Sequence, residues 1–133
     1  MTVEQGAVDP ASDTLEDFLE FAAAGARLVE RGREAYDADE MLRFAAESVL
    51  HKIGEAVARL DREAPDLIAA HPEVNWRDMK AIRNLVAHEY AAVDYGIIWN
   101  ALAEHLPGEA EGVQSILDAR HSADGLPSGS VSG

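Results

Sequence analysis

The chain has 133 residues, of which 47% are hydrophobic, and this length predicts one globular domain with a single core. It contains no cysteine, which excludes disulfides, thiolate nucleophiles and cysteine-based zinc sites and is consistent with a reducing compartment. No stretch approaches the roughly 18 to 20 apolar residues of a membrane span, and residues 1–12 lack the pattern of a signal peptide. We therefore expect a cytoplasmic protein without membrane contact.

The formal net charge of −14 at pH 7 limits the kinds of partner that the chain can bind. Such a charge keeps the surface solvated, and it opposes non-specific binding of nucleic acid, which depends on basic residues. The segment 76–90 is the least acidic stretch in the middle of the chain, because it carries three basic residues against two acidic ones. Any contact with nucleic acid is therefore expected to be local to this segment.

The two ends differ in composition from the middle of the chain. Residues 1–12 mix Gly, Pro and small polar residues, and residues 121–133 are rich in Ser, Gly and Pro, so both ends are predicted to be flexible. The folded domain is predicted to span residues 13–120. Within it, apolar residues recur at spacings of three and four and do not alternate as they would in a strand, which predicts an all-α domain.

The first long helix is predicted from Thr14 to Arg31, ending before Gly32. Asp13 is its expected N-cap, with Glu16 at capping-box spacing. Its apolar stripe is expected to face the core and comprises Leu15, Phe18, Leu19, Ala22, Ala26 and Val29.

The second long helix is predicted from Asp37, with Glu40 at capping distance, to about Leu60 or Asp61. Its expected core residues are Leu42, Ala45, Val49, Ile53, Ala56, Val57 and Leu60. Gly54 lies in the middle of this helix, where glycine costs about 1 kcal/mol relative to alanine. Such a glycine either lets another backbone approach closely or is an unimportant surface residue, and the sequence leaves both readings open.

Shorter helices are expected after Pro72, which disfavours helical angles at the residue before it. The triplet Leu106-Pro107-Gly108 is expected to end one of them, and a final helix is expected to place Val113, Ile116 and Leu117 inward. The predicted helices are Trp76–Tyr90 with Asn75 as N-cap, Tyr95–His105 with Asp94 as N-cap, and Glu109–Arg120. Two long helices followed by two or three shorter ones predict an up-and-down bundle with four main helices.

Four residues of the third helix could act on a phosphodiester: Arg83, Asn84, His88 and Tyr90. The guanidinium of arginine fits phosphate oxygens, and histidine can both take and give a proton near neutral pH. On one straight helix Arg83 and His88 point about 140° apart, too far to converge on one phosphate. Either the helix bends or a second copy of the chain completes the site, with two arginines and two histidines in one groove.

These residues match the Arg-x4-His-x-Tyr motif and resemble the HepT-like toxins of the HEPN (higher eukaryote and prokaryote nucleotide-binding) superfamily. Other segments resemble the same family: Ile53-Gly54-Glu55-Ala56, Pro72-Glu73-Val74-Asn75-Trp76, and Trp99 followed by Leu106-Pro107. The resemblance covers about residues 14–107. An Arg-x4-His pair alone is a weak signal, whereas this ordered set is specific.

The resemblance implies a dimeric, metal-independent RNA endonuclease that needs no cofactor. It also implies that the chain is the toxin of a toxin–antitoxin pair whose antitoxin is an MntA-like nucleotidyltransferase. RNA supplies its own nucleophile, the 2′-hydroxyl, so proton transfer and charge stabilisation suffice for cleavage. His88 is then the base or acid, Arg83 binds the scissile phosphate, and Asn84 orients the phosphate or fixes the histidine tautomer. By the same resemblance, Tyr90 is the hydroxyl that the antitoxin modifies with AMP.

Other readings stay open at this stage. The chain could be a catalytically inactive helical module that binds a nucleotidyltransferase, or a purely structural or ligand-binding bundle. Without the family match, Tyr90 reads as a packed ring with a hydrated hydroxyl. His51 and Glu55 have the spacing of a ligand pair, but the chain has no Glu-x-x-His, so a metal site is disfavoured. Trp76 and Trp99 read as core or interface residues rather than platforms for bases.

Overall fold

The computed structural model describes residues 9–87 and 94–131, with the backbone alone for residues 84–87 and 124–131. Throughout these ranges the ordered elements are helices, and none of them is a strand. None of the described helices combines the length and the apolar character needed to cross a membrane. The elements are α1 (Pro10–Glu30), α2 (Arg33–Ala38), α3 (Glu40–Glu63), α4 (Pro65–Ala70), α5 (Trp76–Ala87), α6 (Tyr95–Asn100), the π-helical turn η2 (Ala101–His105) and α7 (Leu106–Val131).

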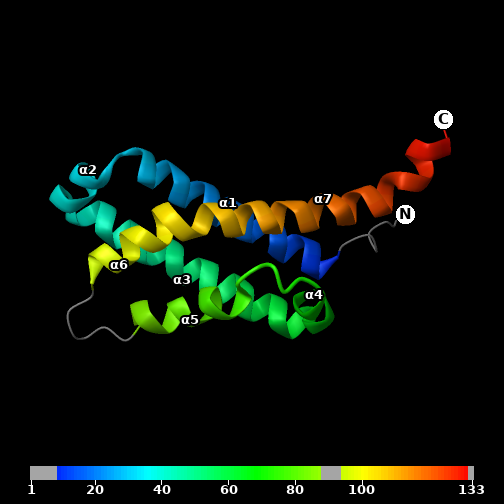
Figure 1. The fold of residues 1–133 in the computed structure, drawn as a ribbon, viewed down its shortest axis with the longest axis horizontal. Coiled ribbons are helices and arrows are strands. Elements are labelled where there is room, and N and C mark those ends of the chain that lie inside the picture. The colour runs from blue at the N-terminus through cyan, green and yellow to red at the C-terminus, as the bar shows by residue number, and fades with distance from the viewer. Residues whose placement is uncertain (1–8, 88–93, 132–133) are drawn as a thin grey trace.

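The helices form an up-and-down bundle, which confirms the predicted all-α fold with four main helices. Figure 1 shows α1, α3, α5 and the continuous rod α6–η2–α7 running alternately in opposite directions along the long axis. The central helix is α3, which contacts α1 on one side and α5 on the other, while α7 packs along α1. The short helices α2 and α4 lie at opposite ends of the bundle. Dimer formation remains a prediction.

The core lies between α1, α3 and α7, where the predicted apolar stripes meet. The inward orientation predicted for Val113, Ile116 and Leu117 is confirmed, since each is less than 5% exposed. The prediction that Ala26 and Ala45 belong to the core is wrong. Both are exposed, because they lie just beyond the edge of the stripe that faces the neighbouring helices. The fully buried side chains include Leu15, Phe18, Ile53, Val57, Leu60 and Leu102.

Helix α1 begins four residues earlier than predicted. Its N-cap is Asp9, whose Oδ1 accepts a hydrogen bond from the backbone N–H of Ala11 at 3.2 Å, and Pro10 occupies the first turn. The predicted cap, Asp13, lies inside the first turn, where its negative carboxylate interacts favourably with the positive end of the helix dipole. A distant part of the chain also holds Asp9 in place, because its carboxylate pairs with Arg120 of α7.

The second predicted helix is divided into α2 and α3, so its predicted start at Asp37 is wrong. Gly32 adopts a φ of 93°, which only glycine tolerates readily, and turns the chain from α1 into α2. Asp39 then caps α3, with its Oδ1 accepting from the N–H of Met41 at 2.9 Å. Tyr36 of α2 is fully buried, and its hydroxyl donates to the backbone carbonyl of Tyr95 at 2.8 Å, which ties α2 to α6.

The predicted break at Leu106-Pro107-Gly108 is wrong, since the chain stays helical from Tyr95 to Val131. The N-cap predicted at Asp94 is confirmed: its Oδ1 accepts from the N–H of Gly96 at 3.0 Å. Proline lacks an N–H and clashes with the carbonyl four residues earlier, and the wider π turn η2, which ends two residues before Pro107, can relieve that clash. Helix α7 therefore absorbs the separate helix expected over Glu109–Arg120.

The structure describes only parts of the two ends that are predicted to be flexible. Pro10–Ser12 form the first turn of α1, and the backbone of α7 is helical as far as Val131. Residues 1–8 and 132–133 lie outside the described part of the chain. The flexibility of segments 1–12 and 121–133 stays a prediction.

Candidate functional site

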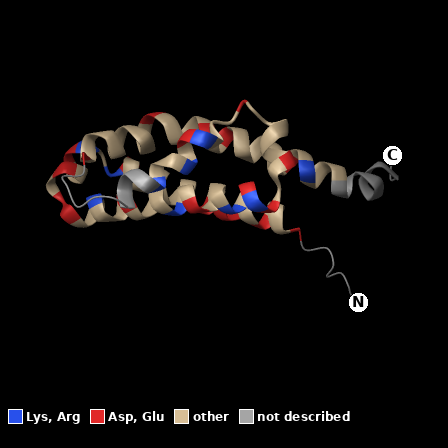
Figure 2. Ribbon diagram, turned by 90° about the horizontal axis from the view of Figure 1, so that it is seen from below, with Lys and Arg blue, Asp and Glu red and all other residues tan. Residues whose placement is uncertain are grey.

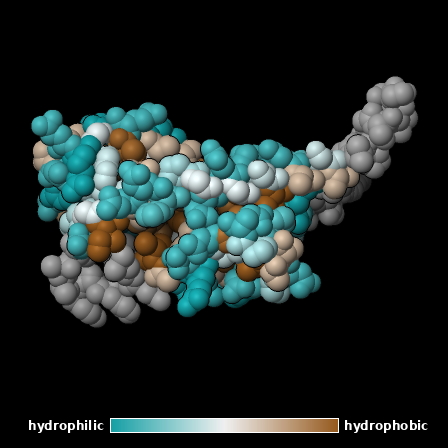
Figure 3. Space-filling view, in the orientation of Figure 1, coloured by the Kyte–Doolittle hydropathy of each residue, from teal (hydrophilic) through white to brown (hydrophobic). Residues whose placement is uncertain are grey.

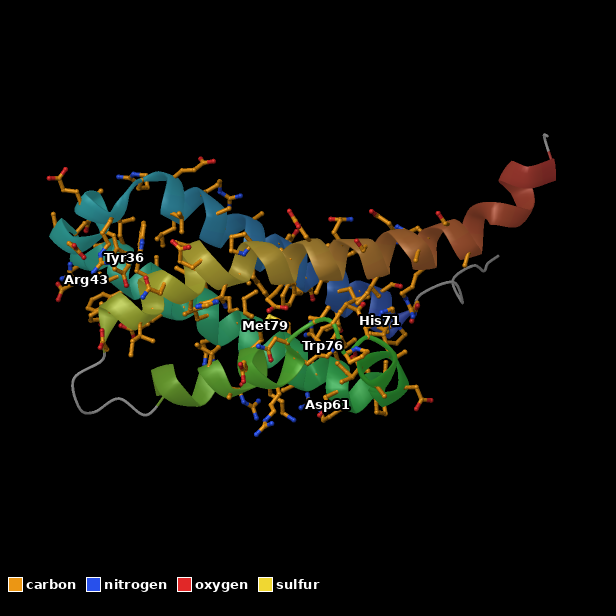
Figure 4. All side chains as sticks on the ribbon, viewed as in Figure 1. Tyr36, Arg43, Asp61, His71, Trp76 and Met79 are labelled. Atoms are coloured by element: carbon orange, nitrogen blue, oxygen red, sulfur yellow. The ribbon has the colours of Figure 1, made fainter. Side chains whose placement is uncertain are left out.

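Helix α5 carries the candidate site, and contacts with two other parts of the chain anchor its start. Trp76 is 6% exposed, and its Nε1 donates to the backbone carbonyl of His71 at 2.9 Å (Figure 4). Asn75 donates through Nδ2 to Asp78 at 2.8 Å, and its backbone N–H donates to Glu109 of α7 at 2.9 Å. Trp76 is thus a packing residue, as predicted, and the start of α5 is fixed relative to α4 and α7.

Gly54 allows α5 to lie directly against α3. A Cβ atom built on Gly54 would stand 2.7 Å from Cβ of Arg83 and 3.2 Å from both the backbone nitrogen of Arg83 and the carbonyl oxygen of Met79. A side chain at this position would therefore push the two helices apart. This finding decides between the two readings of Gly54 in favour of close backbone approach. It also means that α3 sets the position of Arg83.

Glu55, the residue after Gly54, orients the guanidinium of Arg83. Arg83 Nη1 donates to Glu55 Oε2 at 3.2 Å, and His51 Nε2 lies 4.0 Å from the same oxygen. The Arg83 side chain is 29% exposed and that of Glu55 is 52% exposed, so water screens the pair and its net stabilisation is about 0 to 1 kcal/mol. Glu55 can therefore hold the cation in place and still give way to a phosphate.

The structure places one of the four predicted site residues in full. Arg83 lies on the side of α5 that faces α3, at the edge of the bundle. Asn84 is on the backbone of α5, one residue further on, but its side chain lies outside the described part. His88 and Tyr90 both lie outside the described residues. Their convergence with Arg83 is therefore a prediction still.

An open groove of about 920 Å³ extends from Arg83 along α5 towards α4. All the basic residues of α5, namely Arg77, Lys80 and Arg83, lie on its wall. Lys80 Nζ donates to Asp61 Oδ2 of α3 at 2.9 Å, and Figure 4 shows Asp61 at the outer edge of the α3–α5 pair. The other lining residues are Val57, Ile68, Pro72, Glu73, Val74, Asn75, Trp76, Ala81 and Glu109. The groove therefore combines apolar side chains with the row of cations on α5 and with three carboxylates, those of Asp61, Glu73 and Glu109.

The basic residues of this groove stand out against an otherwise acidic chain. Figure 2 shows acidic and basic residues interspersed along the bundle. In helix α5 alone, three basic residues face a single acidic one, Asp78. All three of these basic residues line the groove, next to the carboxylates of Asp61, Glu73 and Glu109. A row of cations on a concave surface can contact an anionic chain.

The described residues contain no group of three or more His, Cys, Asp and Glu side chains placed to hold a metal ion. His51 and Glu55 do approach one another, but Glu55 directs the same oxygen to Arg83. A carboxylate that already pairs with a guanidinium is a poor cation ligand. The absence of a metal from the reaction stays a prediction.

The sequence pattern singled out Arg77 and Lys80 only as basic residues of the least acidic segment, and it did not predict the groove that they line. Glu55 was considered as a possible metal ligand with His51 and as part of the segment Ile53-Gly54-Glu55-Ala56, but not as a partner of Arg83. Its contact with Arg83 joins residues 28 positions apart and depends on the packing of α3 against α5. The one available signal was the Gly54-Glu55 pair, because a glycine inside a long helix marks a place of close approach.

Comparison with known proteins identifies the family of this chain. Residues 12–116 match the protein family described as "Ribonuclease HepT-like". A probable ribonuclease HepT from Thermococcus cleftensis is 31% identical over 97 residues, covering 69% of this chain and 86% of that protein. A putative RNase from Caldanaerobacter subterraneus subsp. tengcongensis is 33% identical over 94 residues, covering 68% and 81%.

A putative RNase from Methanocaldococcus jannaschii is 32% identical over 69 residues, covering 52% of this chain and 61% of that protein. No solved structure matches this chain. The family match spans both the predicted bundle and the segment that bears Arg83. The chain therefore belongs to the ribonuclease HepT-like family, and the enzyme class predicted from its motifs, an RNA-cleaving ribonuclease, agrees with that membership.

Proposed function

We propose that two copies of this chain form a metal-independent RNA endonuclease that acts as a toxin and is neutralised by an MntA-like nucleotidyltransferase. The observation that carries this proposal is the position of Arg83. It is a partly exposed cation, held by Gly54 and Glu55 at the end of the groove, within the residues that match a ribonuclease family. An arginine in such a place can bind the scissile phosphate through two N–H groups.

The reaction needs a base, an acid and a cation. One His88 takes the proton of the 2′-hydroxyl, and the 2′-oxygen attacks the adjacent phosphorus. The bond from phosphorus to the 5′-oxygen breaks, leaving a 2′,3′-cyclic phosphate on one product. The partner subunit's His88 gives a proton to the departing 5′-oxygen. Arg83 stabilises the additional negative charge on the phosphoryl oxygens, and Asn84 orients the phosphate or the histidine.

A second copy of the chain is proposed because Arg83 and His88 would point about 140° apart on one straight helix. One large apolar side chain lies exposed on the same side of α3 as Glu55. Phe44 is 48% exposed and lies 11 residues before Glu55 on α3, so the two point within about 20° of each other. Met41 and Ile97 are also exposed, at 69% and 49%, and Figure 3 shows hydrophobic surface over α6. We propose that the second copy covers the exposed apolar side chains of Met41, Phe44 and Ile97, here called the Phe44 face.

The antitoxin is proposed to attach AMP to the hydroxyl of Tyr90, two residues beyond His88. Each AMP would add phosphate charge and bulk beside the proposed site. Repulsion between this charge and the phosphates of RNA would block the groove. Co-expression with a nucleotidyltransferase is expected to raise the intact mass by whole AMP units, and Tyr90→Phe is expected to remove the increase. An unchanged mass on co-expression would contradict this part of the proposal.

The decisive test of the nuclease is cleavage of single-stranded RNA by purified protein in excess chelator. The wild-type chain should cleave and should arrest growth on expression, whereas Arg83→Ala and His88→Ala should lose both properties while keeping the wild-type circular dichroism spectrum. Cleavage that survives both substitutions would exclude this site. A chain that binds a nucleotidyltransferase tightly but neither cleaves RNA nor arrests growth would be the inactive interaction module instead.

A further inference from the structure

The cations of α5 are placed as a row rather than as a cluster around Arg83. Arg77, Lys80 and Arg83 are spaced by three residues, so their Cα atoms cover about 9 Å along the helix axis. Each step of three residues turns the direction by about 60°, and the row therefore winds along one wall of the groove. A row of this length has more cations than are required to bind a single phosphate.

The anions beside this row are held weakly. Lys80 and Asp61 are 40% and 42% exposed, so their ion pair contributes about 0 to 1 kcal/mol and can be exchanged for a phosphate. Arg77 is exposed and has no ion pair among the described residues. Of the two other carboxylates that line the groove, Glu109 accepts from the backbone of Asn75, and Glu73 is paired with His71 at 3.0 Å. Contacts within the protein thus engage both of those carboxylates.

The shape of the groove and the charge of the chain indicate the class of ligand. A duplex is bound through a broad basic face, which a chain with a net charge of −14 and only three cations in the groove does not offer. A groove of about 920 Å³ with one row of cations fits a single strand that lays its backbone along the wall. Trp76 is buried, and its Nε1 donates to the backbone carbonyl of His71, so its ring cannot stack on a base. Trp76 therefore does not select the base sequence of the strand.

We propose that this groove binds the backbone of single-stranded RNA next to the scissile phosphate, with Lys80 and then Arg77 contacting the successive phosphates outward from Arg83. This inference rests on the proposed nuclease function, because it takes Arg83 as the position of the scissile phosphate. It adds a substrate requirement: RNA must extend several nucleotides to one side of the cleaved bond.

The test compares a dinucleotide with a twelve-nucleotide single strand as substrates. For the wild-type chain, the longer substrate should have a KM lower by about tenfold or more, since each phosphate contact adds affinity. For the double variant Arg77→Ala/Lys80→Ala, most of this gain should be lost, and the slope of log KM against log salt should fall by about 1.4, or roughly 0.7 for each cation on a single strand. Arg27→Ala, which removes an exposed cation of α1, is the matched control and should keep the wild-type gain.

Binding measured separately from cleavage keeps the two proposals distinguishable. A fluorescent twelve-nucleotide strand with 2′-deoxy sugars cannot be cleaved by the proposed chemistry, and its Kd can be measured by anisotropy. A Kd raised about tenfold or more in the double variant, with no cleavage of RNA by the wild type, would overturn the nuclease and keep the groove. Equal Kd values for wild type, double variant and Arg27→Ala would overturn the groove, as would a duplex that competes as well as the single strand.

Discussion

Gly54 and Arg83 approach each other so closely that a methyl group on Gly54 would stand 2.7 Å from Cβ of Arg83. We predict that Gly54→Ala lowers the free energy of unfolding by about 1 to 3 kcal/mol, because overpacking outweighs the gain of about 1 kcal/mol in helix propensity. RNA cleavage should also fall, since the shift of α5 moves Arg83. Denaturant unfolding and initial rates of cleavage measure the two effects.

Gly108 provides the matched control for this substitution. It lies in α7, and a Cβ atom there would meet nothing within 4 Å. Gly108→Ala is therefore expected to raise the free energy of unfolding by about 0.5 to 1 kcal/mol and to leave cleavage unchanged. If both substitutions stabilise the chain equally, the close approach of α3 and α5 has no energetic consequence.

Glu55→Gln tests the ion pair with Arg83. Glutamine retains an oxygen that can accept from the guanidinium, but it removes the negative charge that competes with phosphate. We predict a KM for single-stranded RNA about two- to fivefold lower, in keeping with the small worth of an exposed ion pair. Glu111→Gln makes the same change of net charge at an exposed site on α7 and should leave KM unchanged. A KM that rises in Glu55→Gln would mean that Glu55 holds Arg83 only as a carboxylate.

Phe44→Asp tests the proposed interface between the two copies. A carboxylate in the Phe44 face would have to be buried on dimer formation, which costs several kcal/mol. We predict a monomer by sedimentation velocity, with a wild-type circular dichroism spectrum and cleavage reduced by at least about a hundredfold. Ala119→Asp adds the same charge to the exposed side of α7 and should remain dimeric and active. A dimeric Phe44→Asp chain would place the interface elsewhere.

Tyr36→Phe tests the buried contact between α2 and α6 through its pH dependence. Burial raises the pKa of Tyr36 to about 12 from an ordinary value of 10.0, and the nearby guanidinium of Arg33 reduces this effect only in part. The folded pKa is higher than the unfolded one, so the stabilisation is complete below pH 10 and is lost as the pH rises towards 12. A two-unit shift corresponds to roughly 2 to 3 kcal/mol.

The measurement is the free energy of unfolding between pH 8 and pH 12. At neutral pH, Tyr36→Phe should be less stable by about 1 kcal/mol, because the hydrogen bond to the carbonyl of Tyr95 is lost. At the alkaline end this difference should shrink and then reverse, since phenylalanine cannot ionise. Parallel curves for the two chains would show that Tyr36 does not titrate in this range.

The sequence by itself determined the elements whose signals are local. The apolar spacing of α1, α3 and α7 predicted their buried stripes, and the Asp94 cap was identified correctly from a side chain that bonds two and three residues ahead. The ordered motif around Arg83 identified the family, because a motif depends only on residue order. These signals extend over a few turns of helix at most.

Only the tertiary structure decided the features that join distant parts of the chain. The start of α1 depends on Asp9, which pairs with Arg120, 111 residues away. The continuity through Pro107 depends on a π turn that no sequence rule specified. The orientation of Arg83 depends on Gly54 and Glu55 of another helix. Periodicity shows which residues face inward on one helix, but it carries no information about which residues of a second helix they meet, and those contacts form the site.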